Sequence, residues 1–436
     1  MRVYMRVSTR ARRHPPAGAT ARHGLALPTA IFAIVVIGAL LAGAYFASSQ
    51  ERVIGRNTLI EQRAFNVAEY GLNFDVSNWD QARNIEGSFP VGSADINPRY
   101  VNQIGDTANV TVTRLSPTNF LVVSTGRANI PNPNTESIRR TSMMVQIAYP
   151  SVKLAGAVVS AGTVQVGGSG AVIGFDHDPA GWGQECDAYD TSNLSAIAVA
   201  SPNNLQLQHS TDSSHSEPTQ NNPAGIFASA DSGALRVTQI ATDPNTYIAY
   251  GSETWTTLQS NADVKIPSAW SGRPGPAVAA VNGTTVCNRS LVTNWGQPDH
   301  VDSPTSPNQF KPCISYYPII FVNGDLDISG GKGQGILLVN GSLTMNGGFE
   351  FDGLIIVKND LRRGNGTATI RGGIMVANGV IDCAGNSGSG SGGSCTDGVN
   401  ATGTFTVAFS KCAVENALRA SAILVPVKQR AWAQMY

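Results

Sequence analysis

An uncharged apolar run near the N-terminus constrains this chain more than any other feature of its sequence. The run extends from Leu25 to Ser49, and it is long enough to cross a bilayer as one helix, which needs about 20 residues. Residues 1–24 contain six arginines and no acidic residue. Basic residues beside a membrane helix hold that end in the cytoplasm. We therefore expect the residues after the run to be exported.

The helical pattern continues beyond the apolar run. After Gln50, apolar or small residues recur at spacings of three, four and seven, with charged residues between them, as in an amphipathic helix. The stripe consists of Val53, Ile60, Ala64, Val67 and Gly71, with Phe65, Ala68 and Leu72 beside it. The sequence predicts one helix from about Leu27 to Leu72, roughly 70 Å long at about 1.5 Å per residue. Its first half is apolar all round, and its second half is apolar on one face.

The segment QERVIGRNTLIEQRAFNVAEYGL resembles the N-terminal region of PilX-type pilus assembly proteins, which are minor pilins. The matching residues are Gln50, Glu51, Arg52, Gly55, Gln62, Ala64, Phe65, Ala68, Glu69 and Leu72. The resemblance covers about residues 20–75, with one extra residue between Gly55 and Gln62. It implies that prepilin peptidase cuts after Gly24 and leaves Leu25 as the new N-terminus. Thr29 stands where most type IV pilins carry Glu, which is a departure from the wider pattern.

The sequence is compatible with three kinds of N-terminal segment. A cleaved secretory signal has an apolar core of about 7–15 residues, shorter than this one, although Ala42 and Ala44 would suit cleavage. A plain signal anchor stays uncleaved. A prepilin-type leader is favoured, because the basic segment ends at Gly24, the apolar helix begins at once, and Pro28 lies in its first turn, where its missing N–H costs little.

The exported part is predicted to be mainly β. Residues 77–150 contain three alternating segments that favour a small antiparallel sheet packed on the helix end. From Ser151 the pattern changes to short apolar runs separated by glycine, and it returns near the C-terminus. There, Val322, Val339, Val357 and Val376 follow one another at steps of 17, 18 and 19 residues, and a second register is marked by Gly335, Gly353 and Gly372. This period predicts a parallel β-helix or similar solenoid, with an antiparallel meander as the alternative.

These patterns divide the chain into six segments. They are a basic leader (1–24), a transmembrane and amphipathic helix (25–76), the small sheet (77–150), a first solenoid rung (151–176), a loop-rich insertion (177–317), and the remaining rungs with a C-terminal cap (318–436). Weak strands are expected in the insertion at Ser195–Val199, Gly225–Ser229 and Ala234–Ile240. A short helix capped by Ser410 is expected in the cap. It would cover the open end of the solenoid, with Trp432 and Tyr436 docking back.

All six cysteines follow the apolar run, and no CxxC pair occurs. An even number of cysteines in an exported region predicts disulfides, with buried free thiols as the alternative. The expected pairs are Cys383 with Cys395, Cys287 with Cys313, and Cys186 with Cys412. The first two would each close a loop, and the third follows by elimination.

Little in the sequence indicates catalysis or nucleic-acid binding. The chain has 30 basic and 30 acidic residues, so no net charge attracts nucleic acid. Asp176-His177-Asp178 is interpreted as a polar turn, with a shared cation such as calcium as the alternative. His209, His215 and His300 are expected to be solvated. Four aspartates of the predicted rungs invite comparison with the clustered carboxylates of β-helix polysaccharide lyases, namely Asp325, Asp327, Asp352 and Asp360. However, Ser342 and Thr344 stand at the positions equivalent to Asp325 and Asp327 in the next rung.

We therefore expect a structural protein and not an enzyme, with no cofactor and no metal. Arg362, Arg363 and Arg371 are interpreted as a solvated rim, with an anionic-sugar site as the alternative. The favoured hypothesis is a pilin-like subunit or assembly factor of a type IV pilus or related secretion appendage. It would be held in the inner membrane, exposed to the periplasm or cell surface, and bound to other pilins through its helix. The alternative is a membrane-tethered adhesive or carbohydrate-binding solenoid, whose host or surface ligand the sequence does not identify.

Overall fold

The computed structural model describes most of the chain after the leader. The described residues are 26–96, 100–102, 104–129, 137–166, 171–187, 189, 191–201, 205–207, 225–227, 237–241, 243–303, 305, 307–364, 366–382, 398–401, 404–427 and 432–435. The chain divides into two units, residues 1–63 and residues 64–436. The protein is mainly β, with one long N-terminal helix, an antiparallel sheet and a large parallel sheet.

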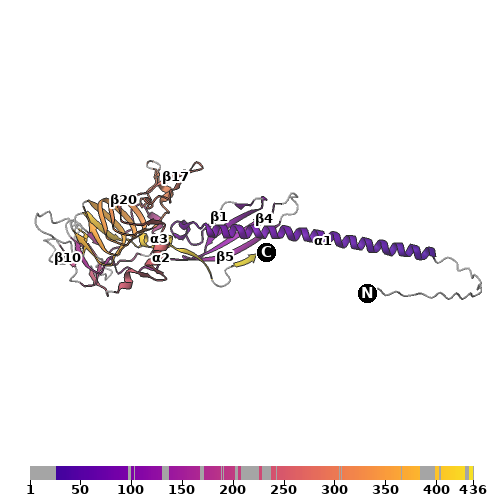
Figure 1. Ribbon diagram of the computed structural model, residues 1–436, viewed down its shortest axis with the longest axis horizontal. Helices are drawn as coiled ribbons and strands as arrows, with labels where there is room; N and C mark the ends of the chain where they lie inside the picture. The colour runs from indigo at the N-terminus through magenta and orange to yellow at the C-terminus, as the bar shows by residue number, and fades with distance from the viewer. Residues whose placement is uncertain are drawn as a thin grey trace, which may run out of the picture. The chain divides into compact units, whose positions relative to one another are not determined.

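The long helix is a single element that begins in the first unit and ends in the second. This helix, α1, comprises Ala26–Ser77 (Figure 1). It extends past the predicted end at Leu72 by about one turn. The remaining described helices are short: η1 (Gln81–Asn84), η2 (Gly183–Glu185), η4 (Pro244–Tyr247), α2 (Trp255–Ser260), η5 (Lys311–Cys313) and α3 (Lys411–Ala420). Ser410 caps α3 as predicted, since its side chain accepts a hydrogen bond from the Ala413 N–H.

The antiparallel sheet contains seven strands in the order β1-β3-β4-β5-β27, with β2 also paired to β3 and β28 to β5. The strands are β1 (Ala94–Ile96), β2 (Tyr100–Val101), β3 (Thr107–Arg114), β4 (Asn119–Arg127), β5 (Ile138–Ala148), β27 (Ile423–Pro426) and β28 (Trp432–Met435). The three central strands confirm the predicted meander. The last two come from the C-terminus, so the chain returns to this sheet after completing the large one.

The second part of α1 packs closely on the antiparallel sheet. Ala64, Ala68 and Leu72 are buried on the helix face that meets it. A Cβ atom added at Gly126 of β4 would lie 2.1 Å from the Ala64 carbonyl oxygen. A Cβ added at Gly71 would lie 2.7 Å from that of Ala108. Small residues on both surfaces thus let the helix backbone approach the strands.

The large sheet contains seventeen strands within the described residues, and every pairing in it is parallel. Its strands are β6 (Gly156–Ser160), β7 (Thr163–Val166), β8 (Ala171–Ile173), β9 (Ser195–Val199), β10 (Leu205–Leu207), β11 (Gly225–Phe227), β12 (Val237–Gln239), β15 (Val264–Ile266), β16 (Trp270–Gly272), β19 (Ile319–Val322), β20 (Leu326–Val339), β21 (Leu343–Val357), β22 (Asp360–Arg363), β23 (Thr367–Val376), β24 (Gly379–Asp382), β25 (Gly398–Ala401) and β26 (Thr404–Phe409). Two small hairpins lie outside both sheets: β13 (Ala249–Tyr250) with β14 (Glu253–Thr254), and β17 (Val278–Val281) with β18 (Thr284–Cys287).

The predicted valine register is confirmed. Val322 pairs with Val339, Val339 with Val357, and Val357 with Val376. The same ladder continues from β23 to β6, β9 and β12, and it begins at β15. The glycine register is confirmed too, because Gly335, Gly353 and Gly372 are consecutive partners. The antiparallel meander is therefore wrong for this region.

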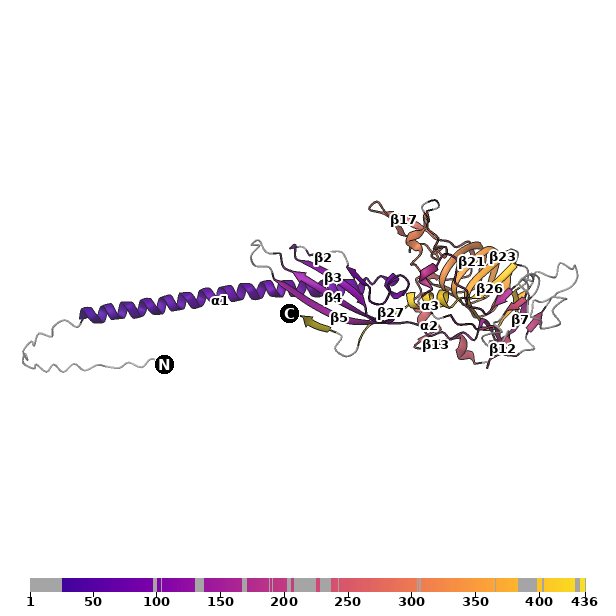
Figure 2. The same cartoon turned by 180° about the vertical axis from the view of Figure 1, so that it is seen from behind.

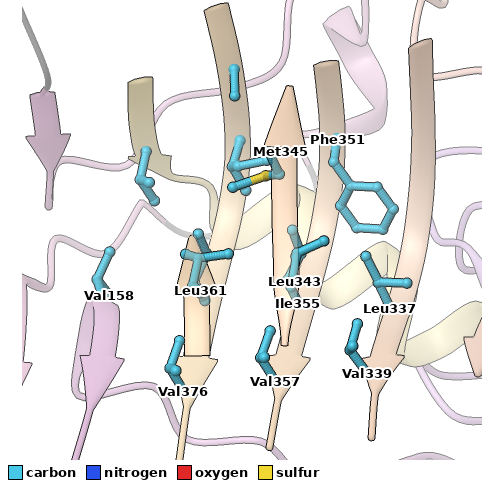
Figure 3. Packing of buried hydrophobic residues seen from close by; sticks show 14 of the residues in the cluster. Val158, Leu337, Val339, Leu343, Met345, Phe351, Ile355, Val357, Leu361 and Val376 are labelled. Atoms are coloured by element: carbon cyan, nitrogen blue, oxygen red, sulfur yellow. The ribbon is translucent and has the colours of Figure 1, made fainter. Parts of the chain in front are cut away.

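Both faces of the valine-bearing strands are buried, which explains their unbroken apolar sequences. One face contributes Leu337, Val339, Ile355 and Val357 to the main core, where Val339, Val357 and Val376 lie in a row (Figure 3). The other face contributes alternate residues such as Leu338 and Ile356 to a second core. Val414, Ala417 and Leu418 of α3 pack into this second core, so the C-terminal helix covers a face of the sheet.

Residues 177–317 are only partly the loops that the sequence suggested. They contribute β9 and β12 to one end of the valine ladder and β15 to the other, whereas β10, β11 and β16 extend the neighbouring ladders. The segment between them, 240–262, crosses the second core, where Tyr247, Trp255 and Leu258 are buried. The β17–β18 hairpin projects from the large sheet in both views (Figures 1 and 2).

Candidate functional sites

The first part of α1 presents an apolar surface with nothing packed on it in the described chain. No charged residue occurs from Ala26 to Gln50, and the large side chains in this stretch are exposed. They include Leu27, Ile31, Phe32, Ile34, Val35, Ile37, Leu40, Leu41, Tyr45 and Phe46. The helix is long and apolar enough to cross a membrane by length and composition. Water is an unfavourable surrounding for such a surface, and an apolar environment would stabilise it.

The predicted processing residues adjoin this surface in sequence. Gly24 and Leu25 lie outside the described residues, which begin at Ala26. Thr29 is exposed in the first turns of α1.

An arginine network holds the connection from α1 to the antiparallel sheet. The Arg83 guanidinium lies 3.0 Å from Asp75 near the end of α1 and 2.8 Å from Asp95 of β1. The buried Arg114 donates hydrogen bonds to the carbonyl oxygens of Asn84 and Phe89, among others. Burial lowers the pKa of Arg114. Neither arginine stood out in the sequence, because each contacts residues whose proximity depends on the fold.

Two disulfides occur among the described residues, both in the part of the chain that follows α1. Cys287 is bonded to Cys313 near the base of the β17–β18 hairpin, and Cys186 is bonded to Cys412 at the start of α3. Cys383 and Cys395, the third proposed pair, lie outside the described residues.

The Asp176-His177-Asp178 segment is held by backbone contacts. Asp176 accepts hydrogen bonds from the N–H groups of Ser192 and Lys411, which ties the turn to the start of α3. A carboxylate oxygen of Asp178 lies within 4.8 Å of the sulfurs of Cys186 and Cys412. These sulfurs are bonded to each other and offer no thiolate to a metal. Burial and the nearby Asp176 raise the pKa of Asp178.

The four aspartates considered for catalysis each have a separate partner. Asp325 accepts a hydrogen bond from the Ser342 N–H, and Asp327 accepts one from the Asn346 side chain. Asp352 pairs with Arg371, and Asp360 pairs with Arg362. The expectation of a solvated Arg371 was wrong, because its guanidinium lies 2.7 Å from the fully buried Asp352. Arg363 also belonged to the expected rim of solvated arginines, and its side chain lies outside the part of the chain that the structure describes.

His300 is buried, so the expectation that it is solvated was wrong. Its ring stacks on Trp182 with centroids 4.4 Å apart. One ring nitrogen lies 3.3 Å from the Gln334 side-chain oxygen, and the other lies 3.3 Å from Glu185. Gln334 is the register neighbour of Asp352, which in turn neighbours Arg371, so a polar row crosses three strands. His209 and His215 lie outside the described residues.

We expect Asp352 to make the stability of the protein depend on pH. Burial raises its pKa from 3.8 to about 6, although Arg371 opposes the shift. The folded protein therefore binds this proton more tightly than the unfolded chain does. Consequently, the free energy of unfolding contributed by this group falls as the pH rises from about 4 to about 6. The effect is on the order of 1–3 kcal/mol.

Thermal unfolding between pH 4 and pH 7 tests this dependence. Asp352→Asn removes the titrating group with little change in volume, so its unfolding temperature should fall less over this range than that of the wild type. Parallel pH profiles for the two proteins would contradict the assignment.

Comparisons with known proteins give a structural similarity but no family. No protein-family model matches the chain, and no curated protein is similar to it. Among solved structures, the chain is similar to the competence-associated pilin ComZ from Thermus thermophilus. The identity is 12% and the TM-score is 0.24, and the match covers 86% of this chain and 97% of that one. The two chains thus share few residues over nearly their full lengths.

Proposed function

We propose that the chain is a pilin-like structural subunit, or an assembly factor, of a type IV pilus or related secretion appendage. The observation that carries the proposal is the composition of α1 along its length. Its first half is uncharged and exposed, and the same helix continues without interruption into a half that packs on the antiparallel sheet. A subunit stored in a membrane and later packed among other helices needs both properties in one element.

The exposed half of α1 would have two successive surroundings. In the inner membrane, lipid chains would cover it, and its length suffices to cross the bilayer. In an appendage, the corresponding helices of other pilins would replace the lipid and keep the apolar side chains away from water. Prepilin peptidase would separate Leu25 from Gly24, removing the basic leader that otherwise holds the N-terminus in the cytoplasm.

The large parallel sheet would serve as a rigid displayed domain. We propose that its ladders are successive rungs of a β-solenoid, in which each rung stacks on its neighbours. Support comes from three parallel ladders that share strands. One runs through the valines, one through Leu326, Leu343 and Leu361, and one from β23 through β26 and β8 to β11. No catalytic role is proposed, because the candidate aspartates each have separate structural partners.

Replacing Gly24 tests the proposed processing. We expect the Gly24→Leu variant to retain its leader and to accumulate in the membrane as a larger form. The bulkier residue should block the peptidase but not membrane insertion, whereas the wild type should be cut and begin at Leu25. N-terminal sequencing of protein from membranes and from sheared surface material measures both outcomes.

Gly38→Leu is a matched control, because Gly38 lies within the same apolar helix and a Cβ there meets nothing within 4 Å. It should be processed normally. A wild-type protein that begins at Met1 would favour the tethered solenoid with an uncleaved anchor. One that begins after Ala42 would indicate a secretory signal, and either result would end the pilin proposal.

A further inference from the structure

The Cys287–Cys313 disulfide fixes an element that has few other supports. Within the described chain, the β17–β18 hairpin pairs with no further strand, and it projects from the large sheet (Figures 1 and 2). A two-stranded hairpin on its own is at best marginally stable in water. The disulfide joins the last residue of β18 to the last residue of η5. The order of the hairpin therefore depends heavily on this one covalent bond.

The chain on either side of the hairpin is anchored without the disulfide. The Pro274 carbonyl oxygen accepts a hydrogen bond from the Lys332 N–H of β20. After the hairpin, Trp295 is 0% exposed and belongs to the main core. The Gly275 N–H donates a hydrogen bond to the Thr293 carbonyl oxygen, which joins the two flanking segments. Loss of the disulfide would thus free the hairpin and leave its base in place.

The two described disulfides differ in how far their cysteines are exposed. Cys287 is partly exposed, although its partner Cys313 is buried. In the other disulfide, both Cys186 and Cys412 are buried, and they pack with Trp182 in one apolar cluster. Thiol–disulfide exchange begins with attack on a sulfur that the reagent is able to reach. Cys287 therefore offers the more accessible point of attack.

A buried amide lies beside the two sulfurs of the accessible disulfide. The side-chain nitrogen of Asn294 lies 3.3 Å from the Cys287 sulfur and 3.7 Å from the Cys313 sulfur. Asn294 is fully buried, and its amide nitrogen also donates hydrogen bonds to the Ala277 and Asn288 carbonyl oxygens, which fix its position. The positive end of this amide dipole favours the negative charge that a leaving thiolate carries.

We propose that the Cys287–Cys313 disulfide is an exchangeable redox site that a dithiol reduces while the Cys186–Cys412 disulfide stays intact. A thiolate of the dithiol attacks the Cys287 sulfur, so a mixed disulfide forms and Cys313 leaves as a thiolate. The second thiolate of the dithiol then attacks the dithiol's own sulfur in the mixed disulfide, and Cys287 leaves as a thiolate. The dithiol loses two electrons and two protons and becomes a disulfide, and the two cysteines take up both.

The reaction would switch the projecting hairpin between two states. With the bond formed, β18 is fixed to η5, and the exposed Val281 is presented at the hairpin turn. With the bond broken, the two short strands have no neighbouring strand to hold them and would open locally. The large sheet would keep its fold, because the base of the hairpin remains anchored.

Timed alkylation of the full chain tests which disulfide reacts first. The oxidised protein, in detergent and without denaturant, is treated with dithiothreitol. Samples are quenched with iodoacetamide, and mass spectrometry of the peptides measures the alkylation of each cysteine. We expect Cys287 and Cys313 to be alkylated about 10-fold faster than Cys186 and Cys412. Equal rates, or faster reaction of Cys186 and Cys412, would overturn the proposal.

Hydrogen exchange tests whether the bond controls the hairpin. In the Cys287→Ser/Cys313→Ser double variant, we expect the amides of residues 278–287 to exchange about 10-fold faster than in the wild type, with β20 and β21 unchanged. The matched control, Cys186→Ser/Cys412→Ser, should leave the hairpin at wild-type rates.

Three results of the exchange experiment would also refute the proposal: unchanged protection of the hairpin in the first variant, an equal loss of protection in β20 and β21, or an equally loosened hairpin in the control. The alkylation rates decide the question on wild-type protein if a variant fails to fold. Neither measurement depends on processing or filament assembly.

Discussion

Val339→Asp is expected to destabilise the large parallel sheet by about 4 kcal/mol or more, because an unpaired charge in a packed interior is among the costliest substitutions. Val339 is 0% exposed. Its side chain lies in the main core, between the register neighbours Val322 and Val357. The carboxylate would have to ionise among aliphatic side chains, become protonated, or force the strands apart. Each route reduces the stability of the neighbouring strands as well.

Thermal unfolding of the full chain in detergent, followed by circular dichroism, measures this effect. Val281→Asp is the matched control, because Val281 lies in the projecting β17–β18 hairpin and is 51% exposed. The Val281→Asp variant should unfold at nearly the wild-type temperature. Equal, small changes in the two variants would show that Val339 does not face a packed core.

Gly353→Ala is expected to prevent correct stacking of the strands at the glycine register. The Gly353 φ angle is +135°, in a region that other residues rarely adopt. An added Cβ would lie 2.1 Å from the Gly335 carbonyl oxygen of the neighbouring strand. Neither backbone can move without breaking the ladder, so a single methyl group should cost several kcal/mol, as other substitutions at strained or overpacked positions do.

Gly348→Ala provides the comparison within the same strand, β21. An added Cβ there meets nothing within 4 Å. We expect Gly348→Ala to unfold at nearly the wild-type temperature, whereas Gly353→Ala should give a much lower yield of folded protein and a lower unfolding temperature. Similar unfolding temperatures for the two variants would contradict the close approach of β20 and β21.

Periodic features of the sequence predicted the fold well. The spacing of Val322, Val339, Val357 and Val376 favoured parallel pairing over an antiparallel meander, and the structure has the register that the spacing predicted. Repeated strands must place equivalent residues side by side, so a repeat in the sequence becomes a row in space. The Ser410 cap was predictable for a different reason, since its hydrogen bond reaches only three residues along the chain.

Contacts between distant segments could not be predicted in the same way. Nothing near His300 in sequence indicates Trp182 as its stacking partner. Arg371 is different, because Asp352 and Arg371 directly precede Gly353 and Gly372, so the predicted glycine register already implied their pairing and the interpretation of a solvated rim overlooked it. Tyr247 belongs to a polar, proline-containing stretch, and its burial depends on the sheet beneath it. His300 and Tyr247 carry no periodic signal, and their environment becomes known only when the strands are assembled.

If the chain is exported as proposed, the return of its C-terminus to the antiparallel sheet imposes an order on folding. If the N-terminus stays at the membrane, β5 emerges early, but its partners β27 and β28 emerge last. Likewise, β6 cannot pair with β23, nor Cys186 with Cys412, until more than 200 further residues have been translocated, the two cysteines being 226 residues apart. Unpaired strand edges attract other strands. The nascent chain therefore has a prolonged need for protection outside the membrane, and a chaperone that shields the β5 edge would meet it.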